Sequence, residues 1–514
     1  RVDLTSMASP TDLRGARIVD DASASSESPL RDDTAEFIRE LRARAEDGGS
    51  DEISKTTASA FDFALPVTVT RAPGRLDFMG GIADYSGSLV LQMPIAEACH
   101  VAAQTRAAPR GRATLTVVSP IPGSRDANDR AETFTCAMDD LLSLTYDAAR
   151  EWFARDQKTR WAAYVAGTAL VLAKEKGARF QGRSVAMFLR SSVPEGKGVS
   201  SSAAVEVASM RALAVLANVT FDGVEGGAEL AELCQLCENA VAGAPCGVMD
   251  QMTASLGRES RLLALLCSNN TVLGHVRMPR GCKLWGIDSG VRHSNDGESD
   301  YGRVRCAAFM FREHLKRTWP EKGIAHLAEL DPRWLEVMLV NGALPRRLSG
   351  ENFLVMYPEG HGDDVTSIDR RVTYDVATCG SHPVMEHRRV ALIRDWLAEV
   401  ADDEAISELV MTQVGNYMYR SHESYGACGL GSDATDKLVR LCEKRGRDGG
   451  VFGAKITGGG SGGVACVLTA DTDDAERAVG EVCEEYGGKP AVFVGSSPGA
   501  VAFGHLSVVI DPSD

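Results

Sequence analysis

Residues 194–203 read Pro-Glu-Gly-Lys-Gly-Val-Ser-Ser-Ser-Ala and lie directly before an alanine- and valine-rich run over residues 203–213. The run is typical of a helix. Glycines let the backbone turn tightly with its N–H groups pointing inward, and a helix N-terminus adds unpaired donors and a positive dipole end that attract an anion. The segment therefore predicts either a phosphate-binding loop or a Gly/Ser turn that only caps an ordinary helix. It is not a Walker A loop, because Lys197 lies between the two glycines.

The charge balance and the cysteine usage exclude several classes of protein. With 514 residues, of which 44% are hydrophobic and 25% charged, the chain can bury a large core and divides into two or more domains. Its formal charge of −16 argues against a surface for nucleic acid or for an anionic membrane, so we expect small-molecule partners. Thirteen scattered cysteines do not form a secreted disulfide framework, which predicts a reducing, cytoplasmic location.

Three smaller features complete this classification. No segment is typical of a signal peptide or of a membrane-spanning run. Cys234 and Cys237 form an isolated C-x-x-C inside a helical pattern, which favours core packing over a zinc site. The chain begins at Arg1 rather than at Met, and the sequence leaves open whether it is a fragment of a longer protein.

The distribution of apolar residues predicts an α+β organisation. Residues 1–56 are rich in Ser, Asp, Glu and Arg apart from a short amphipathic piece at 37–41, which predicts a disordered tail or linker. Strands are predicted at residues 61–70, 89–95, 184–189, 282–288, 463–469 and 491–494, and helices at 161–174, 203–213, 227–241, 301–315, 386–400, 404–421 and 434–445. Residues 320–382 mix short apolar clusters with Gly, Pro and Asp, as in loops or a family-specific insertion.

Three further segments carry candidate functional residues. Arg75 and Asp84 lie in a Pro- and Gly-rich loop after a predicted strand, a good place for substrate contacts, although single charged residues are usually solvated. Glu238 precedes Asp250 by twelve residues. Glu238 is either a site carboxylate or a solvated residue of a helix, and Asp250 is either a site carboxylate or a helix cap. Residues 457–463 form a second glycine-rich loop, or a flexible turn.

Together these segments resemble the three motifs of the GHMP small-molecule kinases, in the family order. Residues 73–75, read as Pro-Gly-Arg, are similar to the first motif, residues 194–203 to the second and residues 457–463 to the third. The resemblance begins near residue 61 and extends to the C-terminus. It implies a two-lobed α+β fold after the linker at 1–56, with a ribosomal-protein-S5-like N-terminal lobe over 57–275 and an α/β C-terminal lobe over 276–514.

Within that family the chain is most similar to the galactokinase branch. The shared segments are Asp84-Tyr85 after the Pro-Gly-Arg stretch, Gly247-Val-Met-Asp-Gln251, Val291-Arg-His-Ser294 followed by Tyr301, residues 386–390, and Ser421-His-Glu-Ser424. Galactokinases, however, carry Gly-Glu-His-Thr-Asp-Tyr where this chain has Gly-Gly-Ile-Ala-Asp-Tyr, so Gly81 and Ile82 replace two polar residues that face the sugar's C6 hydroxymethyl group. A buried hydroxyl without partners costs roughly 1–3 kcal/mol, which favours a sugar that lacks it.

The Gly-Gly-Ile-Ala-Asp-Tyr form resembles that of plant-type L-arabinokinases. L-Arabinopyranose has the galacto arrangement of ring hydroxyls without C6, so the resemblance implies ATP-dependent phosphorylation of its anomeric hydroxyl, with Mg²⁺. Asp250 would accept the hydroxyl proton, and Arg75 would neutralise charge in the transition state. The implied sugar contacts are Asp84, Tyr301, Gly81 and Ile82, and the implied metal ligands are Ser202 and Glu238. The implied ATP-binding residues are Gly196, Lys197, Gly198, Val199, Ser200, Ser201, Ser202, Gly459 and Gly460.

Two other functions stay open on the sequence. One is a galactokinase, or another sugar-1-kinase, with an altered pocket. The other is a catalytically silent sugar sensor that binds sugar and ATP and signals to a partner protein. A sensor would show damage to the catalytic set, whereas Arg75, Glu238 and Asp250 are all present here. The sequence makes no prediction of the oligomeric state.

Overall fold

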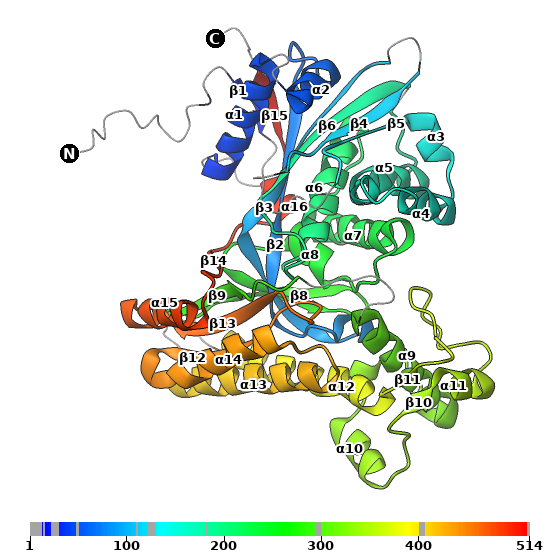
Figure 1. The fold of residues 1–514 in the computed structure, drawn as a ribbon, viewed down its shortest axis with the longest axis vertical. Helices are drawn as coiled ribbons and strands as arrows, with labels where there is room; N and C mark the ends of the chain where they lie inside the picture. The colour runs from blue at the N-terminus through cyan, green and yellow to red at the C-terminus, as the bar shows by residue number, and fades with distance from the viewer. Residues whose placement is uncertain are drawn as a thin grey trace.

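The larger of two main sheets extends from the top of the molecule past its centre (Figure 1). The computed structural model describes residues 13, 16–21, 30–47, 51–108, 112–121, 130–180, 182–292, 300–399 and 407–510. Within them the larger sheet contains β1 (Ala16–Asp21), β2 (Val67–Met79), β3 (Leu89–Ala107), β4 (Thr114–Val118), β5 (Thr133–Ala137), β6 (Arg183–Ser191), β7 (Arg261–Leu266), β8 (Thr271–Arg277) and β15 (Leu506–Ile510). The main order is β1-β15-β2-β3-β6-β4-β5, and β7 pairs with both β3 and β8. Of these pairs only β4–β6 is parallel, which confirms the α+β class.

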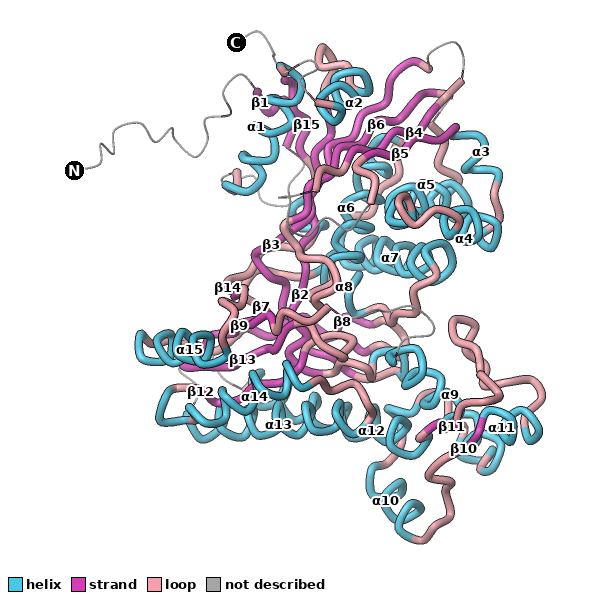
Figure 2. The backbone as a smooth tube through the Cα atoms, viewed as in Figure 1, coloured by secondary structure: helices cyan, strands magenta, loops and turns pink. Residues whose placement is uncertain are grey.

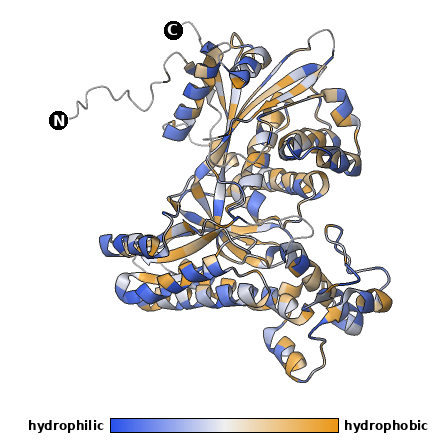
Figure 3. Ribbon diagram, viewed as in Figure 1, coloured by the Kyte–Doolittle hydropathy of each residue, from blue (hydrophilic) through white to orange (hydrophobic). Residues whose placement is uncertain are grey.

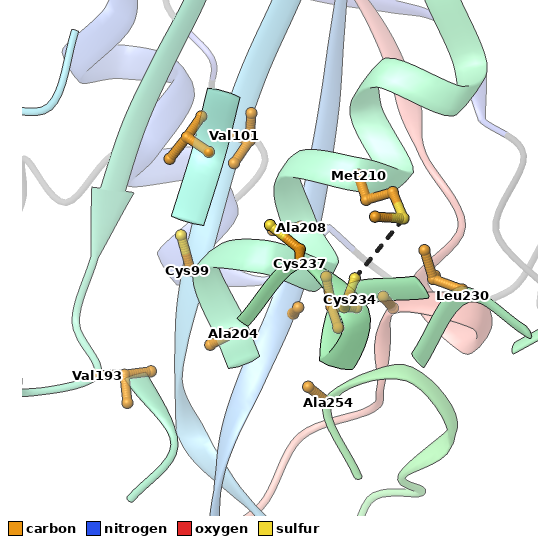
Figure 4. Close-up of a cluster of buried hydrophobic side chains, with 14 of the residues drawn as sticks. Cys99, Val101, Val193, Ala204, Ala208, Met210, Leu230, Cys234, Cys237 and Ala254 are labelled. Carbon is orange, nitrogen blue, oxygen red and sulfur yellow. Dashed lines mark hydrogen bonds between the residues drawn. The ribbon is translucent and has the colours of Figure 1, made fainter. Parts of the chain in front are cut away.

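Helices cover both faces of this sheet, which is why every residue of β2 is buried. On one face lie α3 (Met138–Ser143), α4 (Tyr146–Ala154), α5 (Ala163–Lys176), α6 (Ser201–Leu216), α7 (Gly223–Leu236) and α8 (Met249–Leu256). Alternate strand residues point to opposite faces. Val101 therefore packs toward the α6 side (Figure 4), whereas Val69 packs in the cluster that contains Phe37 of α1 (Asp32–Glu46).

The C-x-x-C pair belongs to the core between these helices. The Cys234 thiol approaches the sulfur of Met210 at 3.8 Å, and Cys237 lies in the same buried cluster (Figure 4). All thirteen cysteines lie in described residues and are free thiols. The packing interpretation is therefore confirmed.

A smaller four-stranded sheet in the order β12-β13-β9-β14 forms the lower part of the molecule. It is built from β9 (Cys282–Asp288), β12 (Val451–Ile456), β13 (Val464–Ala470) and β14 (Val492–Val494), and its helices are α12 (Val376–Ala398), α13 (Glu408–Ala427), α14 (Asp433–Arg445) and α15 (Asp473–Tyr486). The strands of this sheet consist mainly of hydrophobic residues, whereas the helices expose hydrophilic faces (Figure 3). α9 (Asp300–Thr318), α10 (Pro332–Val340), α11 (Gly350–Met356), β10 (Leu348–Ser349) and β11 (Thr373–Tyr374) make a projection at one edge (Figure 2).

The prediction of a disordered tail or linker over residues 1–56 is wrong for the described parts of that stretch. They contain β1, α1 and the start of α2 (Glu52–Ala60). The composition misleads because α1 buries only a narrow stripe, including Phe37, Ile38 and Leu41, and exposes the rest. An ion pair between Asp33 and the buried Arg71, at 2.7 Å, also fixes the helix on the sheet.

Other boundaries differ from the predictions in informative ways. The strand predicted at 61–70 begins only at residue 67, because α2 extends to Ala60. The helix predicted at 227–241 changes at Cys237 into a π-helical stretch, Cys237–Ala242. Residues 320–382 hold α10 and α11 as well as loops. The division at residue 275 stays a prediction, and β15 lies beyond it although it belongs to the larger sheet. None of the helices in the described residues is long and apolar enough to cross a membrane.

Candidate functional site

Most of the predicted site residues meet in one cavity of about 680 Å³. Its lining includes Arg75, Ile82, Asp84, Gly196, Lys197, Gly198, Ser200, Ser201, Ser202, Glu238, Asp250, Tyr301 and Gly459. Three predicted residues, Gly81, Val199 and Gly460, are not part of the lining. Val199 instead uses its carbonyl to accept the backbone N–H of Arg75, at 3.1 Å. His293 and Ser294 of the Val-Arg-His-Ser segment lie outside the described residues.

The Gly/Ser loop presents its hydroxyl groups to the cavity rather than capping α6. Gly196 and Gly198 have φ values of 68° and 70°, in the left-handed region that glycine adopts without strain. Ser200 occupies the N-cap position with φ of 62°, but its side chain makes no capping hydrogen bond, and its buried hydroxyl finds no partner among the described residues. A buried hydroxyl at a helix N-terminus that faces a cavity suits an oxygen-rich anion.

The second and third glycine-rich segments touch backbone to backbone. A Cβ at Gly458 would lie 2.6 Å from the carbonyl oxygen of Gly198, and one at Gly463 would lie 2.4 Å from that of Lys197. The N–H of Val464 donates to the same Lys197 oxygen at 3.0 Å. The loop at 457–463 joins β12 and β13. The close contact leaves no room for side chains at Gly458 and Gly463. The two loops together form a continuous wall of the cavity.

Arg75 and Asp250 form an ion pair at the centre of the cavity. Arg75 donates from Nε and Nη2 to the same oxygen, Asp250 Oδ1, at 3.0 and 2.7 Å, and its Nη1 donates to the Gly198 carbonyl at 2.6 Å. The other carboxylate oxygen of Asp250 accepts no hydrogen bond from the described residues. Burial disfavours the charged form of Arg75, but Asp250 and Asp77 outweigh it and raise the pKa of Arg75. The pair thus leaves one carboxylate oxygen available beside a fixed positive charge.

The location of these two residues corrects two details of the sequence interpretation. Arg75 lies in β2 at an irregularity of the β2–β3 pairing, not in a loop. Asp250 is the second residue of α8, whose N-cap is Val248, so it is not a capping residue. Its ion pair with Arg75 excludes the solvated interpretation of the Arg75 side chain.

Asp84 is a second carboxylate directed into the cavity. It lies in a short 3₁₀ turn, Asp84–Ser86, and is 4% exposed. Its Oδ1 has no hydrogen-bond partner among the described residues. Burial, and next the charge of Asp250, raise the pKa of Asp84 to about 6. A buried carboxylate oxygen without a partner is suited to accept a hydrogen bond from a polyhydroxylated ligand.

Glu238, at the π-helical stretch, faces Ser202 in the same cavity. Burial raises the pKa of Glu238 to about 7, although a hydrogen bond from Ser202 acts in the opposite direction and lowers this pKa. The Gln251 amide donates to Glu238 at 2.5 Å and to the fully buried Glu206 at 3.3 Å. Sequence analysis missed Glu206 and Gln251 as partners of the site, because their meeting depends on how α6 and α8 pack. No group of three or more His, Cys, Asp or Glu side chains in the described residues forms a metal centre.

The donor set nevertheless fits Mg²⁺ bound together with phosphate oxygens. Mg²⁺ usually takes one or two protein ligands and completes its shell with phosphate and water. The Ser202 hydroxyl and the Glu238 carboxylate supply two hard oxygen donors that hydrogen-bond to each other in the cavity wall.

Gly81 lies behind the cavity wall, against Tyr425 of α13. A Cβ at Gly81 would come within 1.8 Å of the Tyr425 hydroxyl oxygen and 2.3 Å of Asp77 Oδ2. Asp77 pairs with Lys455 at 2.7 Å, and both side chains are fully buried. Ile82 does line the cavity, and its φ of 50° is strained for a β-branched residue. The two neighbouring substitutions thus occupy different environments.

Three family models match the chain. Those described as the N-terminal and C-terminal domains of GHMP kinases match residues 163–258 and 404–488, and the galactokinase galactose-binding signature matches residues 58–105. The signature covers β2, the Asp84 turn and most of β3.

Individual proteins similar to this chain include an L-arabinokinase of Arabidopsis thaliana, 40% identical over 510 residues, which cover 88% of this chain and 48% of the relative. The chain thus spans about half the length of that protein. A galactokinase of Chloroflexus aurantiacus is 27% identical over 82% of this chain and 88% of its own length. The structure of Lactococcus lactis galactokinase complexed with galactose covers 84% of this chain and 94% of its own at 21% identity, with a TM-score of 0.62. At that identity the superposition establishes the fold.

Proposed function

Because the chain belongs to the GHMP kinases, we propose that it is a sugar-1-kinase that transfers the γ-phosphoryl group of ATP to the anomeric hydroxyl of L-arabinose. One observation carries the proposal. The same cavity holds a Gly/Ser loop at a helix N-terminus, the Arg75–Asp250 pair and the Asp84 carboxylate with its unpartnered Oδ1. Phosphorylation of a sugar requires three groups: a site that holds the phosphates, a base that accepts the proton of the reacting hydroxyl, and an acceptor for hydrogen bonds from the other sugar hydroxyls.

The chemistry follows from the positions of these groups. The free oxygen of Asp250 accepts the proton of the anomeric hydroxyl, while that hydroxyl oxygen forms a bond to the γ-phosphorus. The bond between the γ-phosphorus and the bridging oxygen breaks, and ADP leaves with that oxygen. Arg75 stabilises the ionised hydroxyl and the charge on the transferring group. The N–H groups and hydroxyls of residues 196–201 hold the phosphates.

Ser202 and Glu238 would hold Mg²⁺, which when bound neutralises phosphate charge. Their two oxygens face the part of the cavity beside the Gly/Ser loop. Because both donors belong to elements that pack against each other, α6 and the π-helical stretch, their spacing is set by the core rather than by a loop.

The preference for L-arabinose rests on Ile82. Asp84 and Tyr301 provide polar groups for ring hydroxyls, whereas Ile82 adds an apolar side chain to the same cavity. An apolar wall offers no hydrogen bond to a C6 hydroxyl. Gly81 acts indirectly in this proposal, since it lets Tyr425 approach the wall from behind.

D-Galactose is the second candidate substrate, because the galactose-binding signature matches residues 58–105. A sugar panel with purified protein, ATP and Mg²⁺ separates the two. We expect kcat/KM for L-arabinose to exceed that for D-galactose by at least about tenfold, the effect of roughly 1.4 kcal/mol. Comparable or higher turnover of galactose would make this protein a galactokinase.

Asp250→Asn tests the catalytic assignment. The variant keeps the shape of the side chain but not its charge, so we expect kcat to fall by about 10²–10⁴-fold while ATP still binds. Asp395→Asn, on the surface of α12 with a side chain 56% exposed, is the matched control and should retain turnover. Near-normal kcat in Asp250→Asn would refute the mechanism, and ATP binding without turnover by the wild-type protein would favour the sugar sensor.

We place the protein in the cytoplasm, on the support of the thirteen free thiols. Cytosolic reductants keep such thiols reduced.

A further inference from the structure

The segment of residues 319–375, between α9 and α12, carries the projection with α10 and α11 (Figure 1). Its sequence indicates loops or an insertion and suggests no role. Its inner side nevertheless reaches the wall of the cavity. One hydrophobic cluster joins Ile82 and Tyr301, which line the cavity. The same cluster contains Leu327 and Phe353 of the segment.

Asp363 connects the segment to α9 through a buried ion pair. It accepts from Arg305 Nε at 2.9 Å and from Nη2 at 2.8 Å, and the two side chains are 7% (Arg305) and 4% (Asp363) exposed. The Thr366 hydroxyl donates to the same carboxylate at 2.6 Å. A two-bonded fork of this kind fixes the plane of the guanidinium. Asp363 therefore sets the direction of the one remaining terminal nitrogen.

That nitrogen, Arg305 Nη1, donates to the carbonyl oxygen of Cys246 at 2.9 Å. The amides of Gln235 and Asn239 reach the same oxygen at the longer distances of 3.3 and 3.4 Å. Cys246 precedes Gly247, at which a Cβ would lie 1.8 Å from Asp84 Oδ2. The turn held by Arg305 is thus in contact with one sugar-site carboxylate.

The same turn leads directly into α8 and Asp250. The Arg305 guanidinium also lies 5.4 Å from the ring centre of Tyr85, which meets Tyr301 edge to face at 5.9 Å. The buried guanidinium of Arg305 therefore contacts the backbone that leads to Asp250. It also contacts Tyr85, which follows Asp84 in the chain and packs against the ring of Tyr301.

We propose that Arg305 and Asp363 are positioning residues of the sugar site. Residues 319–375 hold the turn at 244–248 in the position in which Asp84 and Asp250 contact the same sugar. The inference deepens the proposed kinase function and rests on it. Val248 packs the far end of this turn into the core, whereas Gly247 has no side chain and the Cys246 carbonyl is held by hydrogen bonds. Of the hydrogen bonds to the Cys246 carbonyl, the charged bond from Arg305 is the shortest.

The test compares Arg305→Lys and Asp363→Asn with Arg317→Lys. Lysine keeps the charge next to Asp363 but cannot form a fork and reach Cys246 together. Arg317 also joins α9 to the segment, through Glu359, but it is 53% exposed and lies outside the cavity lining. In both test variants kcat/KM for the sugar should fall about tenfold or more. The Kd for ATP without sugar should change less than about twofold, and Arg317→Lys should match the wild type.

Hydrogen exchange at the Cys246 amide gives a readout that needs no turnover. This N–H donates to Asn239 Oδ1 at 2.9 Å, so we expect faster exchange in both test variants and no change in Arg317→Lys. The proposal would be overturned by folded Arg305→Lys and Asp363→Asn variants that keep wild-type sugar kinetics. It would also be overturned if they lost ATP binding as strongly as sugar turnover, or if their Cys246 amide exchanged at the wild-type rate. A wild-type protein that phosphorylates no sugar would refute the proposed function instead, and the exchange result would still decide the positioning role.

Discussion

Gly81→Ala should destabilise the protein although it adds only one methyl group. The new Cβ would lie 1.8 Å from the hydroxyl oxygen of Tyr425, so the phenol ring must move by more than 1 Å to reach ordinary contact. Tyr425 is fully buried, and its hydroxyl donates to the Gly458 carbonyl at 2.9 Å and to Asp77 at 3.3 Å. Moving the ring away from the new methyl group would lengthen both of these bonds.

The magnitude follows from two contributions. Overpacking a buried site costs about 1–3 kcal/mol, and losing the hydrogen bond to Gly458 costs about 1–1.5 kcal/mol. The sum, about 2–4.5 kcal/mol, corresponds for a chain of 514 residues to a fall in Tm of about 2–4 °C, at roughly 1 °C per kcal/mol. Gly480→Ala is the matched control, because a Cβ at this helix position in α15 meets nothing within 4 Å. It should be neutral or stabilising.

A double-mutant cycle identifies the cause. Tyr425→Phe removes the nearer of the two atoms that the new methyl group would meet, the other being Asp77 Oδ2. The double variant Gly81→Ala/Tyr425→Phe should therefore be more stable than the sum of the single effects predicts, by about 1 kcal/mol or more. Thermal unfolding followed by circular dichroism measures all four proteins. A Gly81→Ala variant that melts with the wild type, or strict additivity in the cycle, would refute the steric argument.

Three further variants test the electrostatics and the substrate wall. Burial raises the pKa of Asp84 to about 6, so this carboxyl stabilises the fold below pH 3.8 and loses that contribution as the pH rises through 6. Asp84→Asn should therefore raise the free energy of unfolding at pH 7–8 by on the order of 3 kcal/mol, and much less at pH 4, while abolishing sugar binding in calorimetry. In the wild type, kcat/KM for the sugar should decline below pH 6 as the same carboxylate is protonated, and a flat profile from pH 5 to 8 would contradict its role. Lys455→Met leaves Asp77 buried without its partner and should cost about 3–5 kcal/mol, part of which Asp77→Asn should restore; a variant with wild-type stability would show that the pair is not needed. Ile82→His places a donor in the wall and relieves the strain of φ 50°, and it should raise the galactose-to-arabinose ratio of kcat/KM up to about tenfold; an unchanged ratio would remove Ile82 as a specificity residue.

The glycine-rich segments were predictable because their chemistry is local. A run of glycines followed by serines and a helix can do few things, and the positive φ angles of Gly196 and Gly198 are the reason for those residues. The strand at 282–288 was also predicted with its observed bounds, because its apolar character changes sharply at both ends.

Other parts of the site depend on contacts between distant segments, which a single sequence does not display. Glu206 and Gln251 meet because α6 and α8 pack together, and Arg305 and Asp363 meet across 58 positions. Gly81 was predicted as a sugar contact, but the space beside it is taken by Tyr425, 344 positions later. Such pairings are decided by tertiary packing, which overrides local pattern.

The insertion of β15 between β1 and β2 has a consequence for biosynthesis. β2 is made more than 420 residues before its neighbour Leu506–Ile510, a delay on the order of half a minute during translation at common rates. Throughout that time one edge of β2 lacks its strand and β1 lacks its only partner in the described sheet. An exposed strand edge invites pairing with other chains. A nascent chain of this protein therefore depends on chaperones, or on α1 and α2 covering the open edge, until its late residues leave the ribosome.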